Sequence, residues 1–285
     1  MTGYELTPVE ERGGILFKRE DLYVPYGRGD VNGGKLRQCR ALIEKVAPKG
    51  VISACSIHSP QSAICAAVAE EFGLPCEILF GGTTYARLME QPMPRLAAKH
   101  GAKLTIAANT GRHNVLYAKA RKLAAERGWF VVEYGFNATK YPDVMFGAIA
   151  SQVENLPDEV DSLCLTCGSG ITSCGVLMGL KKFGKKVGEV HLFATAPDRR
   201  EMIRKNVGPL PFKLTVHDMF HERGFVYEKR EPLRYEGLML HPNYEAKAFR
   251  RMARDGANVG KTLFWVVGAE PTRTGNNTIL VPKRR

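Results

Sequence analysis

Lys35 is the residue whose type and position most directly suggest covalent chemistry. It follows Asn32-Gly33-Gly34 and stands at the start of a segment with helical spacing, so a tight turn would hold its amine in place. An amine held in this way can form a Schiff base with an aldehyde. A Gly-Gly-Lys tripeptide is more often a surface turn with a solvated lysine, so the rest of the chain must decide between the two interpretations.

A second stretch, Gly168-Ser169-Gly170-Ile171-Thr172-Ser173, joins an apolar strand to a helix. Glycines let the backbone approach an anion closely, and the amides and hydroxyls at a helix N-terminus attract phosphate. The same residues would also make an ordinary strand–helix turn with Ser or Thr as the N-cap. The stretch has neither the lysine of a P-loop nor the full dinucleotide-binding pattern. The stretch is therefore a candidate phosphate-binding site, although it matches no known phosphate-binding motif in full.

Two other turns place hydroxyl and carboxyl groups at the start of a helix. Ser59-Pro60-Gln61 ends a turn that suits a carboxylate, although Ser59 and Pro60 also form a good helix start. Tyr244-Glu245 follows a proline-containing loop, and a phenol beside a carboxylate suits proton transfer. The simpler interpretation of Glu245 is a first-turn carboxylate that stabilises the helix dipole.

The periodicity of apolar residues predicts the elements that position these turns. Leu36, Cys39, Leu42 and Ile43, for example, recur at helical spacing after Lys35. We expect strands at 14–18, 50–55, 76–80, 103–107, 129–132, 162–167, 191–194 and 262–267, and helices at 35–46, 62–72, 86–100, 114–127, 144–154, 174–183, 201–205 and 245–254. Strands alternating with helices indicate a parallel α/β sheet, and ligands bind at the carboxyl ends of its strands. The sequence predicts two α/β halves of one body with a cleft between them.

Composition excludes several classes of protein. The 285 residues are 44% hydrophobic and 25% charged, as in a globular protein. No apolar run approaches the roughly 20 residues that span a bilayer, and residues 1–10 have no signal-peptide pattern, so we expect no membrane contact and a cytoplasmic location. Cys164 and Cys167 have C-x-x-C spacing, but no second pair or histidine follows at zinc spacing. We expect the seven cysteines to be reduced and to hold no metal.

The chain is strongly basic. Its 41 lysines and arginines against 29 aspartates and glutamates give a net charge of +12. Clusters of them occur late in the chain, at Lys181, Lys182, Lys185 and Lys186, at Arg199, Arg200, Arg204 and Lys205, at Arg250, Arg251 and Arg254, and at Lys283-Arg284-Arg285. Solvated helix faces explain such clusters as well as a polyanionic partner such as nucleic acid does.

The order of Lys35, the serine turn, the glycine-rich turn and Tyr244-Glu245 resembles that of the tryptophan-synthase-β-like (fold type II) enzymes, which use pyridoxal phosphate. The resemblance is closest to the branch of 1-aminocyclopropane-1-carboxylate deaminase and D-cysteine desulfhydrase. Other matching stretches between residues 14 and 269 are Lys18-Arg19-Glu20-Asp21, Gly34-Lys35-Leu36-Arg37, Glu236-Gly237 and His241-Pro242-Asn243-Tyr244-Glu245-Ala246-Lys247.

This resemblance implies an α/β fold of two three-layer, parallel-sheet domains with the cofactor in the cleft between them. Residues 1–48 and 142–285 would form the large cofactor-binding domain, and residues 49–141 a small inserted domain. Pyridoxal 5′-phosphate would be linked to Lys35, with its phosphate on the stretch from Gly168 to Thr172 and its ring nitrogen facing Glu245. Ser59, Gln61 and Tyr244 would meet the substrate, with Ser59 and Tyr244 joining Lys35 in catalysis. The resemblance also implies a homodimer.

The sequence departs from the family pattern at three places. These departures argue against the usual substrates of the family more than against its cofactor. Pro60 and Gly34 each stand where relatives have an asparagine. Val266-Val267-Gly268-Ala269 stands where relatives have a turn similar to His-Thr-Gly-Gly.

Three hypotheses about function follow. The first is a pyridoxal-phosphate lyase or deaminase that labilises an α-carbon bond of an amino acid, by deamination, β-elimination or decarboxylation. The second is the same chemistry on an amino-acid group attached to nucleic acid, such as a modified base of viral DNA, which the net charge of +12 motivates. The third is a catalytically inactive α/β scaffold that binds nucleic acid.

Overall fold

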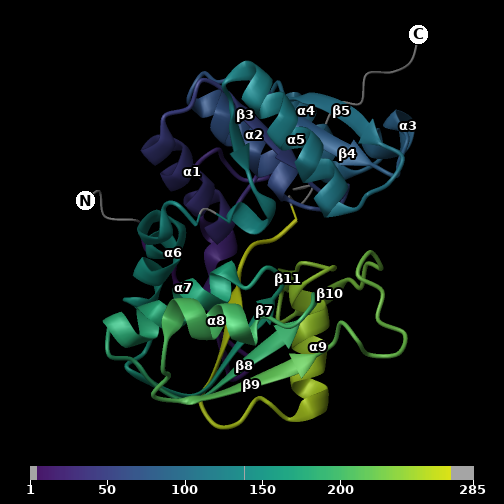
Figure 1. Ribbon diagram of the computed structural model, residues 1–285. Helices are drawn as coiled ribbons and strands as arrows, with labels where there is room; N and C mark the ends of the chain where they lie inside the picture. The colour runs from purple at the N-terminus through teal and green to yellow at the C-terminus, as the bar shows by residue number, and fades with distance from the viewer. Residues whose placement is uncertain (1–4, 138, 271–285) are drawn as a thin grey trace.

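Two parallel sheets form the framework of the protein, and a computed structural model describes residues 5–137 and 139–270 of it (Figure 1). The larger sheet has six strands in the order β1-β2-β12-β7-β8-β9. Only β1 runs antiparallel to its neighbour. The strands are β1 (Val9–Arg12), β2 (Ile15–Arg19), β12 (Thr262–Val266), β7 (Glu159–Cys167), β8 (Lys186–Ala194) and β9 (Lys213–Asp218).

Helices cover both faces of the larger sheet. One face packs against α6 (Pro142–Ala150), α7 (Ile171–Lys182) and α8 (Arg200–Val207), with the short turn η3 (Ser151–Val153) beside them. The other face packs against α9 (Glu245–Asp255) and the hairpin of β10 (Leu233–Tyr235) and β11 (Leu238–Leu240). The last five residues of β7 (163–167) and the last four of β12 (263–266) are therefore buried and almost entirely apolar, as expected for a sheet covered on both sides.

The smaller sheet has four parallel strands in the order β5-β4-β3-β6. They are β3 (Val51–Ala54), β4 (Cys76–Gly81), β5 (Lys103–Ala108) and β6 (Phe130–Val132). One face packs against α2 (Gln61–Glu71) and α4 (Pro92–Lys99), and the other against α5 (His113–Arg127). The short elements η1 (Glu20–Leu22), α3 (Tyr85–Met89) and η2 (Tyr134–Phe136) lie in the connections.

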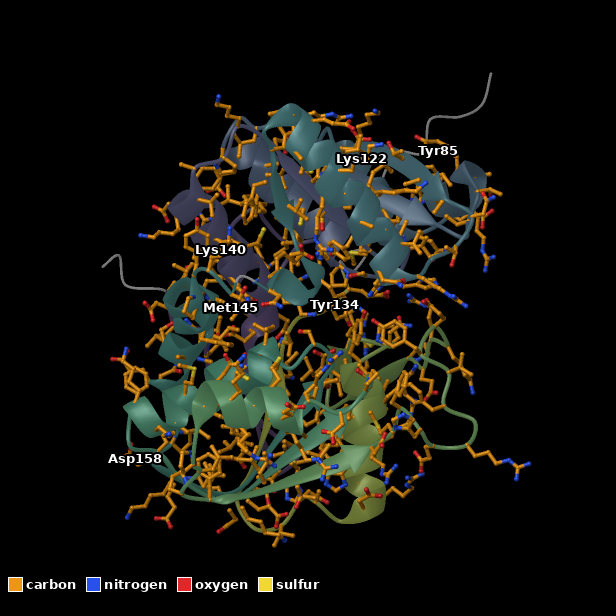
Figure 2. The ribbon with its side chains drawn as sticks, in the orientation of Figure 1. Tyr85, Lys122, Tyr134, Lys140, Met145 and Asp158 are labelled. Carbon is orange, nitrogen blue, oxygen red and sulfur yellow. The ribbon has the colours of Figure 1, made fainter. Side chains whose placement is uncertain are left out.

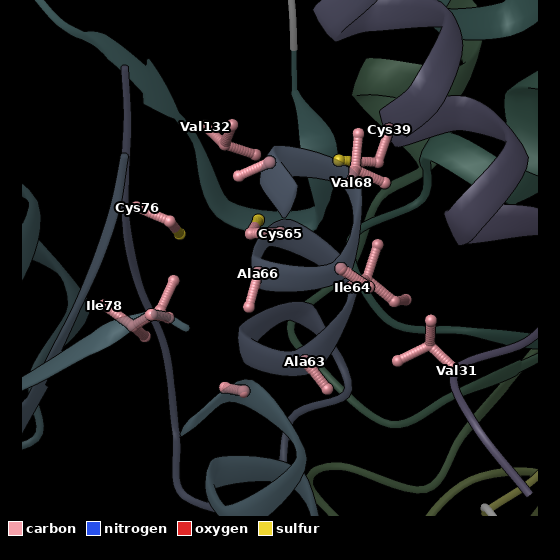
Figure 3. Close-up of a cluster of buried hydrophobic side chains, with 14 of the residues drawn as sticks. Val31, Cys39, Ala63, Ile64, Cys65, Ala66, Val68, Cys76, Ile78 and Val132 are labelled. Carbon is pink, nitrogen blue, oxygen red and sulfur yellow. The ribbon is translucent and has the colours of Figure 1, made fainter. Parts of the chain in front are cut away.

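Helix α1 (Gly34–Val46) joins the two halves. Its residues Leu36, Cys39 and Ile43 belong to the core of the smaller sheet, and Figure 3 shows Cys39 beside Val68 of α2. Leu42 of the same helix belongs to the core of the larger sheet. All strands of the smaller sheet lie within 49–141, so we propose that segment as the small domain, with α1 held between both cores.

The stretch Lys18-Arg19-Glu20-Asp21 forms a buried polar network that supports α1. Lys18 Nζ donates to Thr7 O at 2.7 Å, and Arg37 of α1 pairs with Glu20 at 2.6 Å. A Cβ added to Gly34 would lie 2.5 Å from Glu20 Oε2. A side chain at position 34 would therefore require the Glu20 carboxylate, which pairs with Arg37, to move.

The structure differs from the sequence-based expectation in one helix and in four strands. The helix expected at 86–100 is two helices, α3 and α4, separated at Glu90 and Gln91, because Pro92 starts a new helix and cannot continue the old one. Strands β1, β9, β10 and β11 were not expected. Strands β1 and β9 are partly exposed edge strands, and β10 and β11 have only three residues each, so none of them shows the apolar run that marks a buried strand.

The remaining composition-based expectations concern the membrane and the cysteines. No helix within 5–137 and 139–270 is long and apolar enough to cross a membrane. All seven cysteines are buried free thiols, and in the described residues no group of three or more His, Cys, Asp or Glu side chains could hold a metal ion.

Candidate active site

One cavity lies where the carboxyl ends of strands from both sheets meet. It contains nine of the ten residues that the sequence singled out, namely Lys35, Ser59, Gln61, Gly168, Ser169, Gly170, Thr172, Tyr244 and Glu245. The space between its lining atoms, with the open mouth included, is about 860 Å³. Ile171 is the exception, because its side chain belongs to the core of the larger sheet and only its backbone N–H is available for a ligand.

A turn pressed against the end of β12 fixes the position of Lys35. Gly33 has φ 96° and ψ 174°, and a Cβ there would lie 2.5 Å from Val267 O. Gly34 N donates to the same oxygen at 3.0 Å. Asn32 adds a second clamp, since its side-chain amide accepts from Ala269 N at 2.8 Å and donates to Ala269 O at 3.0 Å. The turn therefore delivers Lys35 at the first turn of α1.

Replacing Gly33 by alanine should destabilise the protein and misplace Lys35. The backbone conformation alone costs a residue with a side chain about 1–3 kcal/mol, and the clash with Val267 O adds to it. We expect a lower melting temperature and lower activity. Gly14→Ala is the matched control, because Gly14 also has a positive φ (76°) but open space around it. Equal losses for the two variants would contradict the close approach to Val267.

The Lys35 amine lies near an aromatic ring in the cavity. Its Nζ is 5.8 Å from the centre of the Tyr244 ring. Burial lowers the pKa of Lys35 from its usual 10.5, and the negative charge of Glu245 opposes this shift. A lower pKa increases the fraction of neutral amine, which is the nucleophilic form.

Glu245 presents one unsatisfied carboxylate oxygen. Its Oε1 accepts from Val267 N at 3.2 Å, whereas the buried Oε2 has no partner among the described residues. Burial raises the pKa of Glu245 to about 7, although its own backbone N–H, Lys35 and Val267 N–H all lower it. A buried, unpaired carboxylate oxygen is costly. A bound group with an N–H in the cavity would relieve that cost.

The glycine-rich turn leaves the N-terminus of α7 uncapped. Gly170 has φ 85° and makes no side-chain cap. Within the described part of the chain, no group accepts from the first-turn N–H of Ile171, Thr172 or Ser173. Thr166 Oγ1, which also lines the cavity, has no partner either. These donors and the helix dipole make an open site for a phosphate.

The polar groups of the serine turn Ser59-Pro60-Gln61 are largely engaged in hydrogen bonds within the protein. Ser59 N donates to Ser56 O at 3.0 Å, Gln61 N donates to Ser59 Oγ at 3.3 Å, and Pro60 has no N–H. The Gln61 side-chain Nε2 donates to Ser53 Oγ at 2.9 Å, and its Oε1 accepts from Gly135 N at 3.0 Å. Gln61 lines the cavity, but its amide holds α2 against the smaller sheet, so its direct role in substrate binding stays a prediction.

A pair of phenols forms another wall of the cavity. The hydroxyls of Tyr244 and Tyr227 lie 2.6 Å apart, and burial raises the pKa of both. Both phenols are therefore protonated at neutral pH, and because one hydroxyl donates to the other, one proton of the pair is left to donate to a ligand. His241 packs against Tyr244 with ring centres 4.7 Å apart, and burial lowers the pKa of His241 to about 4, so its imidazole is neutral.

The segment that carries Tyr227 bridges the two halves of the protein. Lys247 Nζ donates to Val226 O at 2.8 Å, which anchors the segment on α9. Glu228, which follows Tyr227, reaches the other half of the protein. Its carboxylate lies 3.0 Å from His58 Nε2 and accepts from Ser56 Oγ at 3.2 Å. The segment therefore closes one side of the cavity beside the serine turn.

Several residues of the site gave no indication in the sequence. Tyr227 lies in an irregular segment, Tyr134 begins the short turn η2, and Thr166 is the second-last residue of β7, so none of them belongs to a recognisable motif. Asn32 and the backbone of 267–269 were not assigned roles, although they form the clamp behind Lys35. Only the proximity of these segments in the fold identifies them.

A lysine amine with a lowered pKa, an unpaired carboxylate oxygen and an uncapped helix N-terminus in one cavity fit a phosphorylated aldehyde with a ring nitrogen. The family model described as pyridoxal-phosphate dependent enzyme matches residues 4–259, and the chain belongs to that family. Its cofactor is therefore pyridoxal 5′-phosphate, and it is a pyridoxal-phosphate-dependent enzyme.

Among curated proteins, the chain is 23% identical to the O-seryl-dTMP PLP-dependent decarboxylase of Salmonella phage ViI, over 90% of this chain and 78% of that protein. Among solved structures, an ACC deaminase homologue matches with a TM-score of 0.74 and 19% identity, over 94% of this chain and 90% of that one. Threonine deaminase isoform 2 from Solanum lycopersicum matches with a TM-score of 0.64 and 14% identity, over 92% and 79% of the two chains. The predicted fold type II architecture and cofactor are confirmed.

Proposed function

We propose that this enzyme decarboxylates an amino acid that is joined through its side chain to a nucleotide. The curated relative supports the reaction and the substrate class, since its name describes a decarboxylase of a seryl group on dTMP. Decarboxylation requires a free amino group and a free carboxylate, so the nucleotide must be attached through the side chain. The homodimer and the cytoplasmic location stay predictions beside this proposal.

The serine turn is the observation that carries the choice of decarboxylation. A deaminase or β-eliminating lyase keeps the substrate carboxylate throughout, so N–H donors to that group serve it well. A decarboxylase loses the carboxylate as CO₂, so a strong grip on its negative charge stabilises the ground state more than the transition state. Ser59 N and Gln61 N are already bonded within the turn, and Pro60 has no N–H to offer.

The residues of the cavity have distinct roles in this proposal. The Lys35 amine would bind the cofactor covalently, the N–H groups after Gly170 would bind its phosphate, and Glu245 Oε2 would accept from its protonated ring nitrogen. When bound, pyridoxal 5′-phosphate supplies an electron-withdrawing ring that weakens the bonds of the substrate α-carbon. The bond from the α-carbon to the carboxylate carbon breaks, CO₂ leaves, and a proton from Lys35 or Tyr244 takes its place on the α-carbon.

A deaminase or β-eliminating lyase that acts on a free amino acid is the second candidate. The protonated hydroxyl pair of Tyr244 and Tyr227 favours it, because a phenol close to the amine of Lys35 is placed to protonate a leaving group. The two candidates differ in what they release, CO₂ in one and ammonia in the other.

The test is to supply the cofactor-loaded enzyme with O-seryl-dTMP or with free serine and to measure CO₂ and ammonia. We expect CO₂ from O-seryl-dTMP and little of either product from serine. Pro60→Ala restores an N–H at a backbone conformation that alanine adopts freely (φ −65°, ψ −14°). We expect it to lower both KM and kcat, because it strengthens ground-state binding of the carboxylate. Ammonia release from free serine, without CO₂ from the nucleotide, would refute the proposal.

A further inference from the structure

Arg199 is a cation fixed at the edge of the glycine-rich turn. Its Nε donates to Gly168 O at 3.2 Å, and its side chain packs with Met202 over the space where a Cβ on Gly170 would project. The side chain is half-buried. The guanidinium is thereby held on the turn that forms the phosphate site, with its two terminal nitrogens uncommitted to any hydrogen bond with the described residues.

The charge of Arg199 is not neutralised by the protein. Among the residues that the structure describes, no carboxylate lies within ion-pair distance of its guanidinium. The neighbouring Arg200 does have a carboxylate partner, because its guanidinium pairs with Asp198 at 2.7 Å. A half-buried arginine without a carboxylate is placed to bind an anion, and its planar fork suits phosphate.

An aromatic side chain at the cavity wall belongs to a segment that contacts the same glycine-rich turn. A Cβ on Gly135 would lie 2.5 Å from Ser169 Oγ, so the glycine-rich turn touches the segment that carries Tyr134. Tyr134 lines the cavity, and its ring packs against His113 with centres 4.7 Å apart. Figure 2 places Tyr134 between the two bodies of the protein, and the His113 ring supports it from α5.

We propose that Arg199 and Tyr134 form a nucleotide subsite, in which the Tyr134 ring stacks on the base and the Arg199 guanidinium binds the phosphate of the nucleotide. This inference rests on the proposed function for the identity of the nucleotide. Aromatic rings bind bases of any sequence through their faces, and a guanidinium beside such a ring supplies the charge that a phosphate needs. The subsite selects an amino acid carried on a nucleotide over the free amino acid.

The phosphate bound by Arg199 has two possible sources, the nucleotide and the cofactor, and each has its own assay. For the nucleotide, dTMP is tested as a competitive ligand of the cofactor-loaded enzyme, with thymidine as the probe that lacks the phosphate. For the cofactor, the apoenzyme is titrated with pyridoxal 5′-phosphate and with pyridoxal. Arg199→Ala and Arg199→Lys are compared with Arg200→Ala, which makes the same change of charge one residue away.

We expect Arg199→Ala to weaken dTMP binding by about 10-fold or more, as for loss of a hydrogen bond to a charged group. Thymidine binding should not change, Arg199→Lys should lie in between, and Arg200→Ala should match the wild type. Tyr134→Ala should weaken dTMP and thymidine alike. Melting temperatures of the variants identify any variant that fails to fold. If Arg199→Ala does not fold, the dTMP affinity of Arg199→Lys takes its place in the comparison.

Two results would overturn the inference. One is dTMP binding that is the same in Arg199→Ala and the wild type. The other is a loss of affinity for pyridoxal 5′-phosphate but not for pyridoxal or dTMP, which would assign Arg199 to the cofactor. Failure of the proposed decarboxylation is separate from both. If dTMP still binds through Arg199 but O-seryl-dTMP releases no CO₂, the proposed function is refuted and the subsite stands.

Discussion

Replacing Lys35 by alanine should abolish activity, with a loss of at least about 1,000-fold in kcat, on the scale of removing a covalent catalytic group. The protein should also lose the visible absorbance of covalently held cofactor. The physical reason is that the Gly33–Gly34 turn aims this one amine into the cavity that contains Glu245 and the open phosphate site. Activity assays and absorbance spectra of the cofactor-loaded protein measure both effects.

Lys35→Arg is the matched control for the charge of this side chain. Arginine keeps a cation beside Tyr244 and Glu245, but it does not lose its proton in proteins and cannot take the place of a neutral amine. We expect Lys35→Arg to be as inactive as Lys35→Ala, with a melting temperature close to that of the wild type. An arginine variant that retained substantial activity would show that Lys35 acts only as a charge.

Replacing Glu245 by glutamine should lower kcat by about 100-fold, the scale of losing a preorganised electrostatic group. Glutamine has nearly the same shape, so its oxygen can still accept from Val267 N. It cannot provide the negative charge that keeps a ring nitrogen protonated and the ring electron-withdrawing. Glu44→Gln, on the exposed face of α1, makes the same chemical change outside the cavity and should leave kcat unchanged.

The same variant tests the protonation of Glu245 in the cofactor-free protein. Burial raises the pKa of Glu245 from its usual 4.5 to about 7, so between these values the folded protein holds a proton that the unfolded chain has released. Stability should therefore fall as the pH rises through this window, by an amount on the order of 3 kcal/mol. The fall should be absent in Glu245→Gln, and denaturant unfolding between pH 4 and pH 8 measures it. A fall of equal size in both proteins would show that another group causes it.

Much of the fold could be predicted from the sequence because its buried elements have clear patterns. The strand that ends at Cys167 and the helix that contains Leu36, Cys39 and Ile43 lie where their apolar residues predict them. Strand β9 could not be predicted in this way, since an edge strand is only partly buried and lacks a continuous apolar run. The break before Pro92 was visible in the sequence and was missed.

The site could be predicted only where a turn carries its own chemistry. Lys35, the glycine-rich turn and Glu245 were found because glycines and a helix start mark each of them, and the structure brings them to one cavity. Tyr227 could not be found, because it comes from an irregular segment that Lys247 and Glu228 hold in place through tertiary contacts. The hypothesis of an inactive scaffold loses its support, because the chain belongs to a family of pyridoxal-phosphate-dependent enzymes and Lys35 and Glu245 line one cavity with the glycine-rich turn.

The central claim is that Lys35 holds the cofactor, and mass mapping of the reduced enzyme tests it most directly. The cofactor-loaded protein is treated with borohydride, which fixes an imine-linked cofactor permanently to its lysine, and is then digested. We predict that the added mass lies on the peptide that contains Lys35, whereas the buried Lys18 and Lys247, which donate to backbone oxygens, stay unmodified. Added mass on a different lysine, or no added mass in a protein that has bound cofactor, would contradict the account.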